Sequence, residues 1–210
     1  MYVPPHFAVD DRDRLIGLMR SASFAQLITV ADGEPFASHL PLLWQEGDGP
    51  QGKLIGHMAR ANPQWRHFAS AQAGAAKALA IFAGPHAYIS PSWYESAAQV
   101  PTWNYAAVHA YGTPRIVEDE AAVLAILERL VGTYESGFEK PWRMAGLPAG
   151  HAARMSKAIV AFEMPIDRLE GKWKLGQNKT VADRVGTAVE LERLGGENNL
   201  AIAALTRDTL

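Results

Sequence analysis

The sequence predicts a protein of the α+β class, built on a closed or half-open antiparallel barrel with flanking helices and a short helical C-terminal tail. Three observations predict this. An Asp32-Gly33 pair lies between two apolar, β-rich runs, further apolar runs follow in series, and helical patterns are few. The regular strand–helix alternation of a doubly wound sheet is missing, so that fold is less expected.

The first part of the chain predicts one helix and three strands. Asp10 and Asp11 precede a helical pattern of apolar residues from Leu15 to Ala22, so the helix has a capping residue at its start. Residues 24–44 form the hairpin around Asp32-Gly33, because Asp-Gly between β-rich runs favours a tight turn. Residues 53–58 predict the third strand.

The middle of the chain alternates strands with loops and two helices. Asn62 can cap a helix and Pro63 suits its first position. Residues 77–90 and 104–117 predict strands, joined by a long loop rich in proline and aromatic residues. Asp119 is expected to cap the strongest amphipathic helix, whose apolar stripe contains Val123, Leu127, Leu130, Val131 and Tyr134.

The last part of the chain predicts a loop over 135–151, a strand over 157–175 and two short helices separated by Gly195-Gly196. The apolar residues of the first of these helices are Val185, Val189, Leu191 and Leu194. We expect residues 1–178 to form the barrel domain and residues 179–210 to form a helical tail packed on the same domain.

Composition limits the function. With 210 residues, 48% apolar and 20% charged, the chain is expected to be one globular domain. Its 20 basic and 22 acidic residues give a net charge of -2, which argues against a broad nucleic-acid-binding surface. Cysteine is absent, so disulfides and thiol chemistry are excluded. No segment predicts a secretion signal or a membrane span, and we expect a cytoplasmic location.

Sequence motifs exclude several enzyme classes. The chain lacks the dinucleotide-binding pattern G-x-G-x-x-G, the P-loop pattern and the nucleophile elbow G-x-S-x-G. Its seven histidines follow no ligand spacing, so we expect no metal site and name no catalytic residue.

The stretch "HMARANPQW" favours an anion site. His57 ends a strand, Arg60 lies in the connection, and Asn62 opens a helix whose free N–H groups attract an anion. An arginine beside such a helix can hold a phosphate. The alternative is that Asn62 only caps the helix and Arg60 is a solvated surface residue. A phosphate site beside an aromatic segment suggests flavin mononucleotide (FMN). For Trp103, Tyr105 and Tyr111 taken alone, packing in the core or at a subunit interface is more expected than stacking on a ring.

Six stretches together resemble the PaiB family of FMN-binding negative transcriptional regulators. In chain order they are "MYVPPHF", "SHLPLLW", "GHMARANPQW", "FAGPHAYISPSWY", "VPTWNYAAVHAYG" and "KWKLGQNK". The resemblance covers nearly the whole chain. It implies an FMN-binding split β-barrel, related to pyridoxamine-phosphate oxidase, that works as a homodimer with the flavin at the subunit interface.

The resemblance also implies which residues bind FMN. Arg60 and Asn62 would hold the phosphate, with His57 beside them. Ser38, His39 and Leu40 would run along the flavin. The ring end, or the partner subunit, would supply Trp103, Asn104, Lys174, Gln177 and Asn178. One departure is Gly176, where the family more often has serine.

Three functions follow from this resemblance. The first is a flavin-dependent negative regulator that acts on genes directly or through a partner, although the charge balance does not support DNA contact. The second is an FMN-dependent oxidoreductase with a nicotinamide donor, in which the flavin supplies the chemistry. The third is a flavin or haem carrier without turnover.

Overall fold

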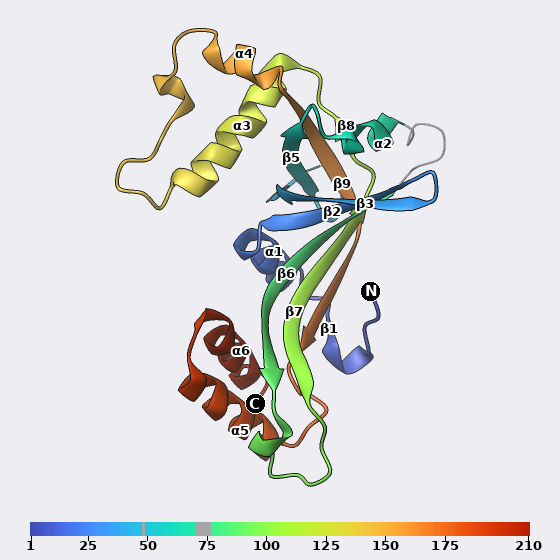
Figure 1. Cartoon of the computed structure of the whole chain (residues 1–210), viewed down its shortest axis with the longest axis vertical. Coiled ribbons are helices and arrows are strands. Elements are labelled where there is room, and N and C mark those ends of the chain that lie inside the picture. The colour runs from blue at the N-terminus through green and yellow to red at the C-terminus, as the bar shows by residue number, and fades with distance from the viewer. Residues whose placement is uncertain (48, 70–76) are drawn as a thin grey trace. The chain divides into compact units, whose positions relative to one another are not determined.

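The strands form an open antiparallel sheet with helices beside it (Figure 1), which confirms the predicted α+β class. The computed structural model describes residues 1–47, 49–69 and 77–210. The strands are β1 (Ala8–Val9), β2 (Phe24–Ala31), β3 (Glu34–Pro41), β4 (Leu43–Gln45), β5 (Lys53–Ala59), β6 (Ala78–Ile89), β7 (Thr102–Gly112), β8 (Arg115–Ile116) and β9 (Ile159–Lys174). The helices are α1 (Arg12–Ser21), α2 (Arg66–Ala69), α3 (Glu120–Glu135), α4 (His151–Ser156), α5 (Val181–Leu194) and α6 (Glu197–Arg207).

The strand order along the sheet is β3-β2-β6-β7-β9-β5-β4, and β1 and β8 also pair with β9. The hairpin of β2 and β3 is in register from Phe24 opposite Pro41 to Ala31 opposite Glu34. Its turn places Asp32 at φ 53° and Gly33 at φ 81°, the left-handed conformations that favour this dipeptide. The hairpin predicted from Asp32-Gly33 is therefore confirmed.

Contacts divide the chain into two compact units. The first unit contains Met1–Ala22, Phe82–His109 and Glu170–Leu210. The second unit contains Ser23–Ile81 and Ala110–Leu169. The strands β6, β7 and β9 each continue from one unit into the other. The expected boundary after residue 178 stays a prediction.

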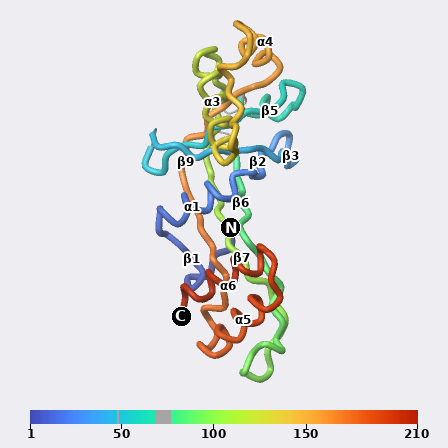
Figure 2. Tube along the Cα trace, turned by 90° about the vertical axis from the view of Figure 1, so that its left-hand side faces the viewer, coloured from blue at the N-terminus to red at the C-terminus, as the bar shows by residue number. Residues whose placement is uncertain are grey.

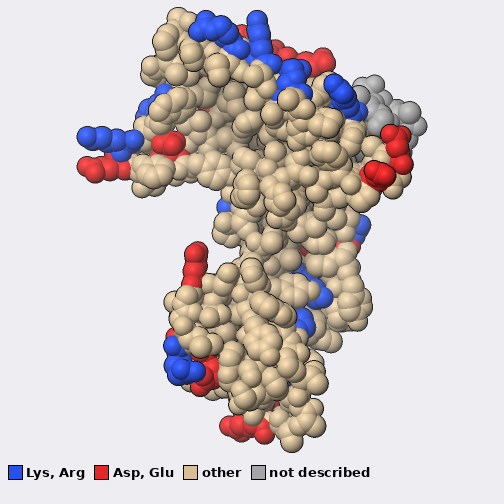
Figure 3. Space-filling view, in the orientation of Figure 1, with Lys and Arg blue, Asp and Glu red and all other residues tan. Residues whose placement is uncertain are grey.

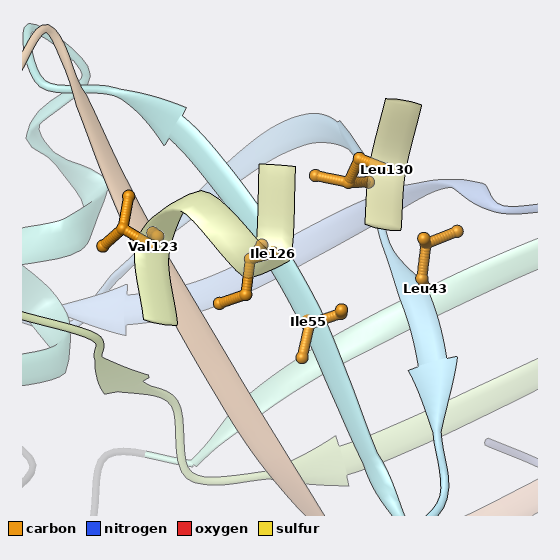
Figure 4. Packing of buried hydrophobic residues seen from close by; sticks show 6 residues of the cluster. Leu43, Ile55, Val123, Ile126 and Leu130 are labelled. Atoms are coloured by element: carbon orange, nitrogen blue, oxygen red, sulfur yellow. The ribbon is translucent and has the colours of Figure 1, made fainter. Parts of the chain in front are cut away.

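The core of the second unit lies between α3 and the strands β4, β5 and β9 (Figure 4). Asp119 caps α3 by accepting a hydrogen bond from the amide of Ala122 at 2.8 Å, as predicted. The buried face of α3 consists of Val123, Ile126 and Leu130. The predicted stripe is correct at Val123 and Leu130, and at Leu127, which packs partly buried against this core. It omitted Ile126 and included Tyr134, which is exposed.

In the first unit, α1 packs through Leu15, Ile16, Leu18 and Met19, and the Asp11 side chain caps its start. The helices α5 and α6 lie side by side, joined at Gly195 and Gly196 (Figure 2). The predicted apolar face of α5 is correct only at Leu191, because Val185, Val189 and Leu194 are exposed. The other residues of the face that packs are Asp183, Thr187 and Ala188.

The segment after α3 and the helix after Pro63 were only partly predicted. The loop expected over 135–151 is followed by the short helix α4, which the sequence analysis missed. Its N-terminal flank is Gly150, which has φ 71° and offers no side-chain cap as a sequence signal. The helical pattern after Pro63 predicts a buried face of Trp65, Phe68 and Ala69. Phe68 is buried and Trp65 is half-buried, whereas the side chain of Ala69 lies outside the described residues. Among the described residues, no helix has the length and apolar character that crossing a bilayer requires.

Candidate functional site

The connection after β5 brings two predicted residues together. Asn62 precedes a short 3-10 turn, Pro63–Trp65, and its Oδ1 accepts a hydrogen bond from the amide of Gln64 at 3.0 Å. Its Nδ2 donates to Oγ of Ser38 on β3 at 2.8 Å. Asn62 therefore caps the turn and also ties it to the hairpin.

Gln64 is a residue of this site that the sequence analysis missed. Its side chain is fully buried, and Nε2 donates to the carbonyl oxygens of Leu27 and Phe36 and to Oγ1 of Thr29, at 2.8 to 3.2 Å. Thr29 also shares a hydrogen bond with Nδ1 of His67 at 2.9 Å. The turn is thus fixed to both strands of the hairpin, and only the occurrence of glutamine beside a capping residue could have signalled it.

Arg60 is held by the backbone at the start of β9. Its Nε donates to the carbonyl oxygen of Lys157 and its Nη2 to that of Ile159, both at 2.8 Å. The indole Nε1 of Trp65 in turn donates to the carbonyl oxygen of Arg60 at 3.0 Å. Arg60 is exposed, but two nitrogens of its guanidinium are fixed by these carbonyl oxygens.

A cavity of about 500 Å³ adjoins Arg60 in the second unit. Arg60, Lys157, Ser156 and Trp65 are among the residues that line it. Two carboxylate residues, Glu118 and Glu120, line it as well. Its volume lies within the range of small-molecule sites, and its donors suit an anion.

The other predicted residues of the second unit are separated by strand alternation. His39 is exposed and its ring stacks on Phe24, with the ring centroids 6.3 Å apart, whereas the adjacent Leu40 is buried.

His57 lies on β5 opposite Ala161, and burial lowers the pKa of its imidazole. Its Nδ1 is buried and has no hydrogen-bond partner among the described residues. The ring is therefore neutral at pH 7.

The predicted ring-end residues lie in the first unit. Trp103 and Asn104 follow each other on β7 and so point to opposite faces. Trp103 is 54% exposed, whereas Asn104 is 3% exposed. The Trp103 ring has its centroid 6.0 Å from those of both Tyr88 and His86 on β6. An exposed aromatic cluster therefore covers part of this sheet face.

The end of β9 and the following turn hold Trp103 in place. Nζ of Lys174 donates to Oγ1 of Thr102 at 2.5 Å and to the carbonyl oxygen of Trp103 at 2.6 Å. The side chain of Gln177 bonds back to the end of β9, since its Nε2 donates to the carbonyl oxygen of Trp173 at 2.7 Å. Asn178, next in the chain, is exposed.

Gly176 lies in the same turn at φ 81°, a conformation that glycine adopts without strain. The departure from the family pattern thus falls at a position where glycine suits the backbone.

Asp183 on α5 is a second residue that the sequence analysis missed. Its side chain is 1% exposed and accepts hydrogen bonds from the amides of Glu95 and Ser96 and from Oγ of Ser96, at 2.7 to 3.0 Å. Burial alone would raise the pKa of Asp183, but the hydrogen bonds from Ser96, Thr180 and Glu95 hold it below the ordinary range. The carboxylate therefore fixes the proline-rich aromatic segment, which joins β6 to β7 over residues 90–101, to α5.

Comparison with known proteins identifies the family. The model of the family described as "Putative FMN-binding domain" matches residues 1–168. The chain belongs to this family. It is 35% identical over 213 residues to "Protease synthase and sporulation protein PAI 2" of Bacillus subtilis. The alignment covers 100% of this chain and 98% of the relative. An uncharacterised protein of Emericella nidulans is 30% identical over 228 residues, covering 94% of this chain and 89% of that protein.

Solved structures share the fold of this family member. The FAD and haem binding protein of Mycobacterium smegmatis matches with a TM-score of 0.62 and 22% identity, over 80% of this chain and 74% of that one. The flavocytochrome Anf3 of Azotobacter vinelandii matches with a TM-score of 0.61 and 16% identity, over 82% and 72%. The resemblance to the PaiB family and the expected split-barrel fold are confirmed, and the family assigns FMN as the cofactor.

The residues around the cavity fit the chemistry of FMN. A guanidinium, an ammonium and a hydroxyl group suit its phosphate, and the indole of Trp65 offers an apolar wall for a flat ring. The guanidinium of Arg60 is already oriented by two carbonyl oxygens, so little side-chain entropy remains to be lost on binding. Which of the predicted residues contact the flavin remains a proposal.

Proposed function

We propose that this protein is an FMN-binding negative regulator of the PaiB type that works as a homodimer. The full-length identity of 35% to the Bacillus subtilis relative carries the proposal, because it includes the tail beyond the FMN-binding family model. In this role FMN supplies the redox chemistry, and the protein holds it and presents the resulting state to a partner.

Arg60, Ser156 and Lys157 would hold the phosphate of FMN, and Asn62 and Ser38 would maintain the turn beside them. Glu118 and Glu120 repel a phosphate, so the phosphate would occupy the Arg60 end of the cavity. Arg60 would thus bind and orient the anion, while the hydrogen bond from Asn62 to Ser38 would keep the connection in position.

Replacement of Arg60 tests the phosphate assignment. Arg60→Ala should weaken FMN binding about 10- to 100-fold, the value of one hydrogen-bonded charge. Arg60→Lys should retain part of the affinity. Arg129→Ala, which removes an exposed arginine from α3, is the matched control. Unchanged FMN affinity in a folded Arg60→Ala protein would refute the assignment.

A homodimer is supported by the exposed aromatic cluster of Tyr88, Trp103 and His86. Exposed apolar groups that gather on one face are typical of interaction surfaces. Light scattering of the purified protein measures its mass directly. Trp103→Ala should shift the dimer towards the monomer, and a monomeric wild type would contradict the homodimer.

Regulation through the tail would not rest on a basic surface. Acidic and basic side chains are interspersed over α5 and α6 (Figure 3), and Glu190 and Glu192 pair with Arg193 and Arg207 at 2.8 and 2.7 Å. We therefore propose that a partner protein mediates the effect on genes. A gel-shift assay with promoter DNA at low and high salt tests this, since tight binding by the protein alone would contradict it.

A further inference from the structure

Three lysines gather in the first unit where β9 ends and the tail begins. Lys172 and Lys174 are two residues apart on β9, so they share one face of the strand, and Lys179 follows the turn. Lys172 is only 7% exposed, and the other two are half-buried. Burial, followed by the neighbouring charges of Lys172 and Lys179, lowers the pKa of Lys174. Lys172 and Lys179 thus each lie close enough to Lys174 to repel its ammonium group.

Neutral groups surround these ammonium groups. Lys172 donates to the carbonyl oxygen of Tyr2 at 3.0 Å and lies 5.3 Å from the centroids of the Tyr2 and Tyr105 rings. Lys179 donates to Oε1 of Gln99 and lies 5.5 Å from the Tyr94 ring centroid. Over residues 1–47, 49–69 and 77–210, none of the three lysines forms an ion pair with a carboxylate.

The buried carboxylate of the same unit is already engaged. Asp183 accepts its three hydrogen bonds from Glu95 and Ser96 and is not among the partners of the lysines. Cation–π contacts offset only part of the cost of removing an ammonium group from water. A partly buried cluster of three like charges is therefore under-compensated, and an anion placed among them would remove both the repulsion and the desolvation penalty.

We propose that Lys172, Lys174 and Lys179 form a binding site for an oxyanion, the phosphate or carboxylate group of a small ligand. Lys174 is the central group, because its two hydrogen bonds to Thr102 and Trp103 leave one N–H for the ligand. The site lies in the first unit and is additional to the cavity beside Arg60, to which we assign the phosphate of FMN. It would couple a second, anionic ligand to the strand that carries Trp103.

Lysine acylation, read by mass spectrometry, tests the site directly. The full-length protein is pulsed with acetic anhydride in chloride or in inorganic phosphate at equal ionic strength. Phosphate should slow acetylation of Lys174 and Lys179 about fivefold or more, whereas the exposed Lys140 of the second unit should react at an unchanged rate. Equal rates at every lysine in both salts would overturn the proposal.

Thermal stability provides a second measurement. Phosphate should raise the Tm of the wild type above its value in chloride, because a ligand that binds only the folded state stabilises it. Lys179→Met should abolish this increase and Lys179→Arg should restore it. Lys179 is chosen because Lys172 is buried, so that its replacement could prevent folding. An increase that persists in Lys179→Met would count against the site.

FMN and riboflavin, which lacks the phosphate, distinguish this site from the FMN cavity. FMN retention is followed in each variant by visible absorption. If Lys179→Met loses the phosphate effect and keeps FMN, the second site is supported independently of the flavin. If FMN protects the lysines while riboflavin and inorganic phosphate do not, the cluster belongs to the flavin phosphate. That result would overturn both the second site and the assignment of the phosphate to Arg60.

Discussion

Removal of the Asp183 carboxylate is expected to release the aromatic segment from α5. The change Asp183→Ala deletes three hydrogen bonds to a charged acceptor and leaves two amides and one hydroxyl without their partner. Each such bond contributes about 1.5–3 kcal/mol, but bonds to one carboxylate are not additive. We expect a loss of about 3–5 kcal/mol in the free energy of unfolding, because the two amides and the hydroxyl would be left without an acceptor.

Thermal unfolding followed by circular dichroism measures this loss. At about 2–4 °C per kcal/mol for a chain of this size, Asp183→Ala should lower Tm by about 6–20 °C. Asp183→Asn should lose less, because it keeps one acceptor oxygen. The control Glu190→Gln breaks an exposed ion pair and should change stability by less than about 0.5 kcal/mol.

The pH dependence provides a further check. Because the pKa of Asp183 in the folded protein lies below its ordinary value, its stabilisation is present above the ordinary value and is lost as the pH falls through the folded-state pKa. The deficit of Asp183→Ala at pH 7 should therefore shrink below about pH 4. A variant that melts within about 1 kcal/mol of the wild type at pH 7 would refute the role of this carboxylate.

Three further predictions concern the second unit. Burial lowers the pKa of His57, so the wild type should lose stability relative to His57→Gln as the pH falls from about 7 to about 5, and parallel urea-unfolding curves would contradict this. Gly112→Ala should lower the free energy of unfolding by about 1–3 kcal/mol, because the new Cβ meets the carbonyl oxygen of Pro165. Gly132→Ala in α3 is the control: its Cβ meets no atom within 4 Å, and it should raise the free energy of unfolding by about 0.5–1 kcal/mol. Equal shifts in Tm for the two variants would refute the contact at Gly112. Ile126→Ala should cost about 2–5 kcal/mol in urea unfolding and Ile126→Val about 0.5–1.5 kcal/mol, and equal losses would contradict its burial.

Features that depend on neighbouring residues were predictable from the sequence. The turn at Asp32-Gly33 and the caps at Asp11 and Asp119 form as expected, because each involves residues only a few positions apart. Asn62 was likewise recognised as a cap. Its second hydrogen bond, to Ser38, arises because the hairpin places β3 beside the turn.

Features that depend on distant residues were missed or misjudged. Gln64 finds its partners 28 to 37 positions earlier in the chain, and Asp183 finds its partners 87 and 88 positions earlier. The face of α5 was misassigned because its valines have helical spacing. The opposite face is the one that approaches the aromatic segment, where a Cβ on Gly186 would lie too close to the carbonyl oxygen of Trp93. Small residues permit this close approach, which apolar spacing does not report.

The α+β class, most of the strands, the helix caps and the family resemblance with its cofactor could be predicted from the residues alone, because these follow from local patterns and from stretches that can be compared directly. The fold was needed to show which face of α5 is buried, which carbonyl oxygens hold Arg60, and which carboxylate fixes the aromatic segment. It was also needed to show that Lys172, Lys174 and Lys179 gather without a compensating carboxylate among the described residues. Burial and electrostatic compensation depend on groups that lie far apart in the chain and meet only when the sheet is assembled.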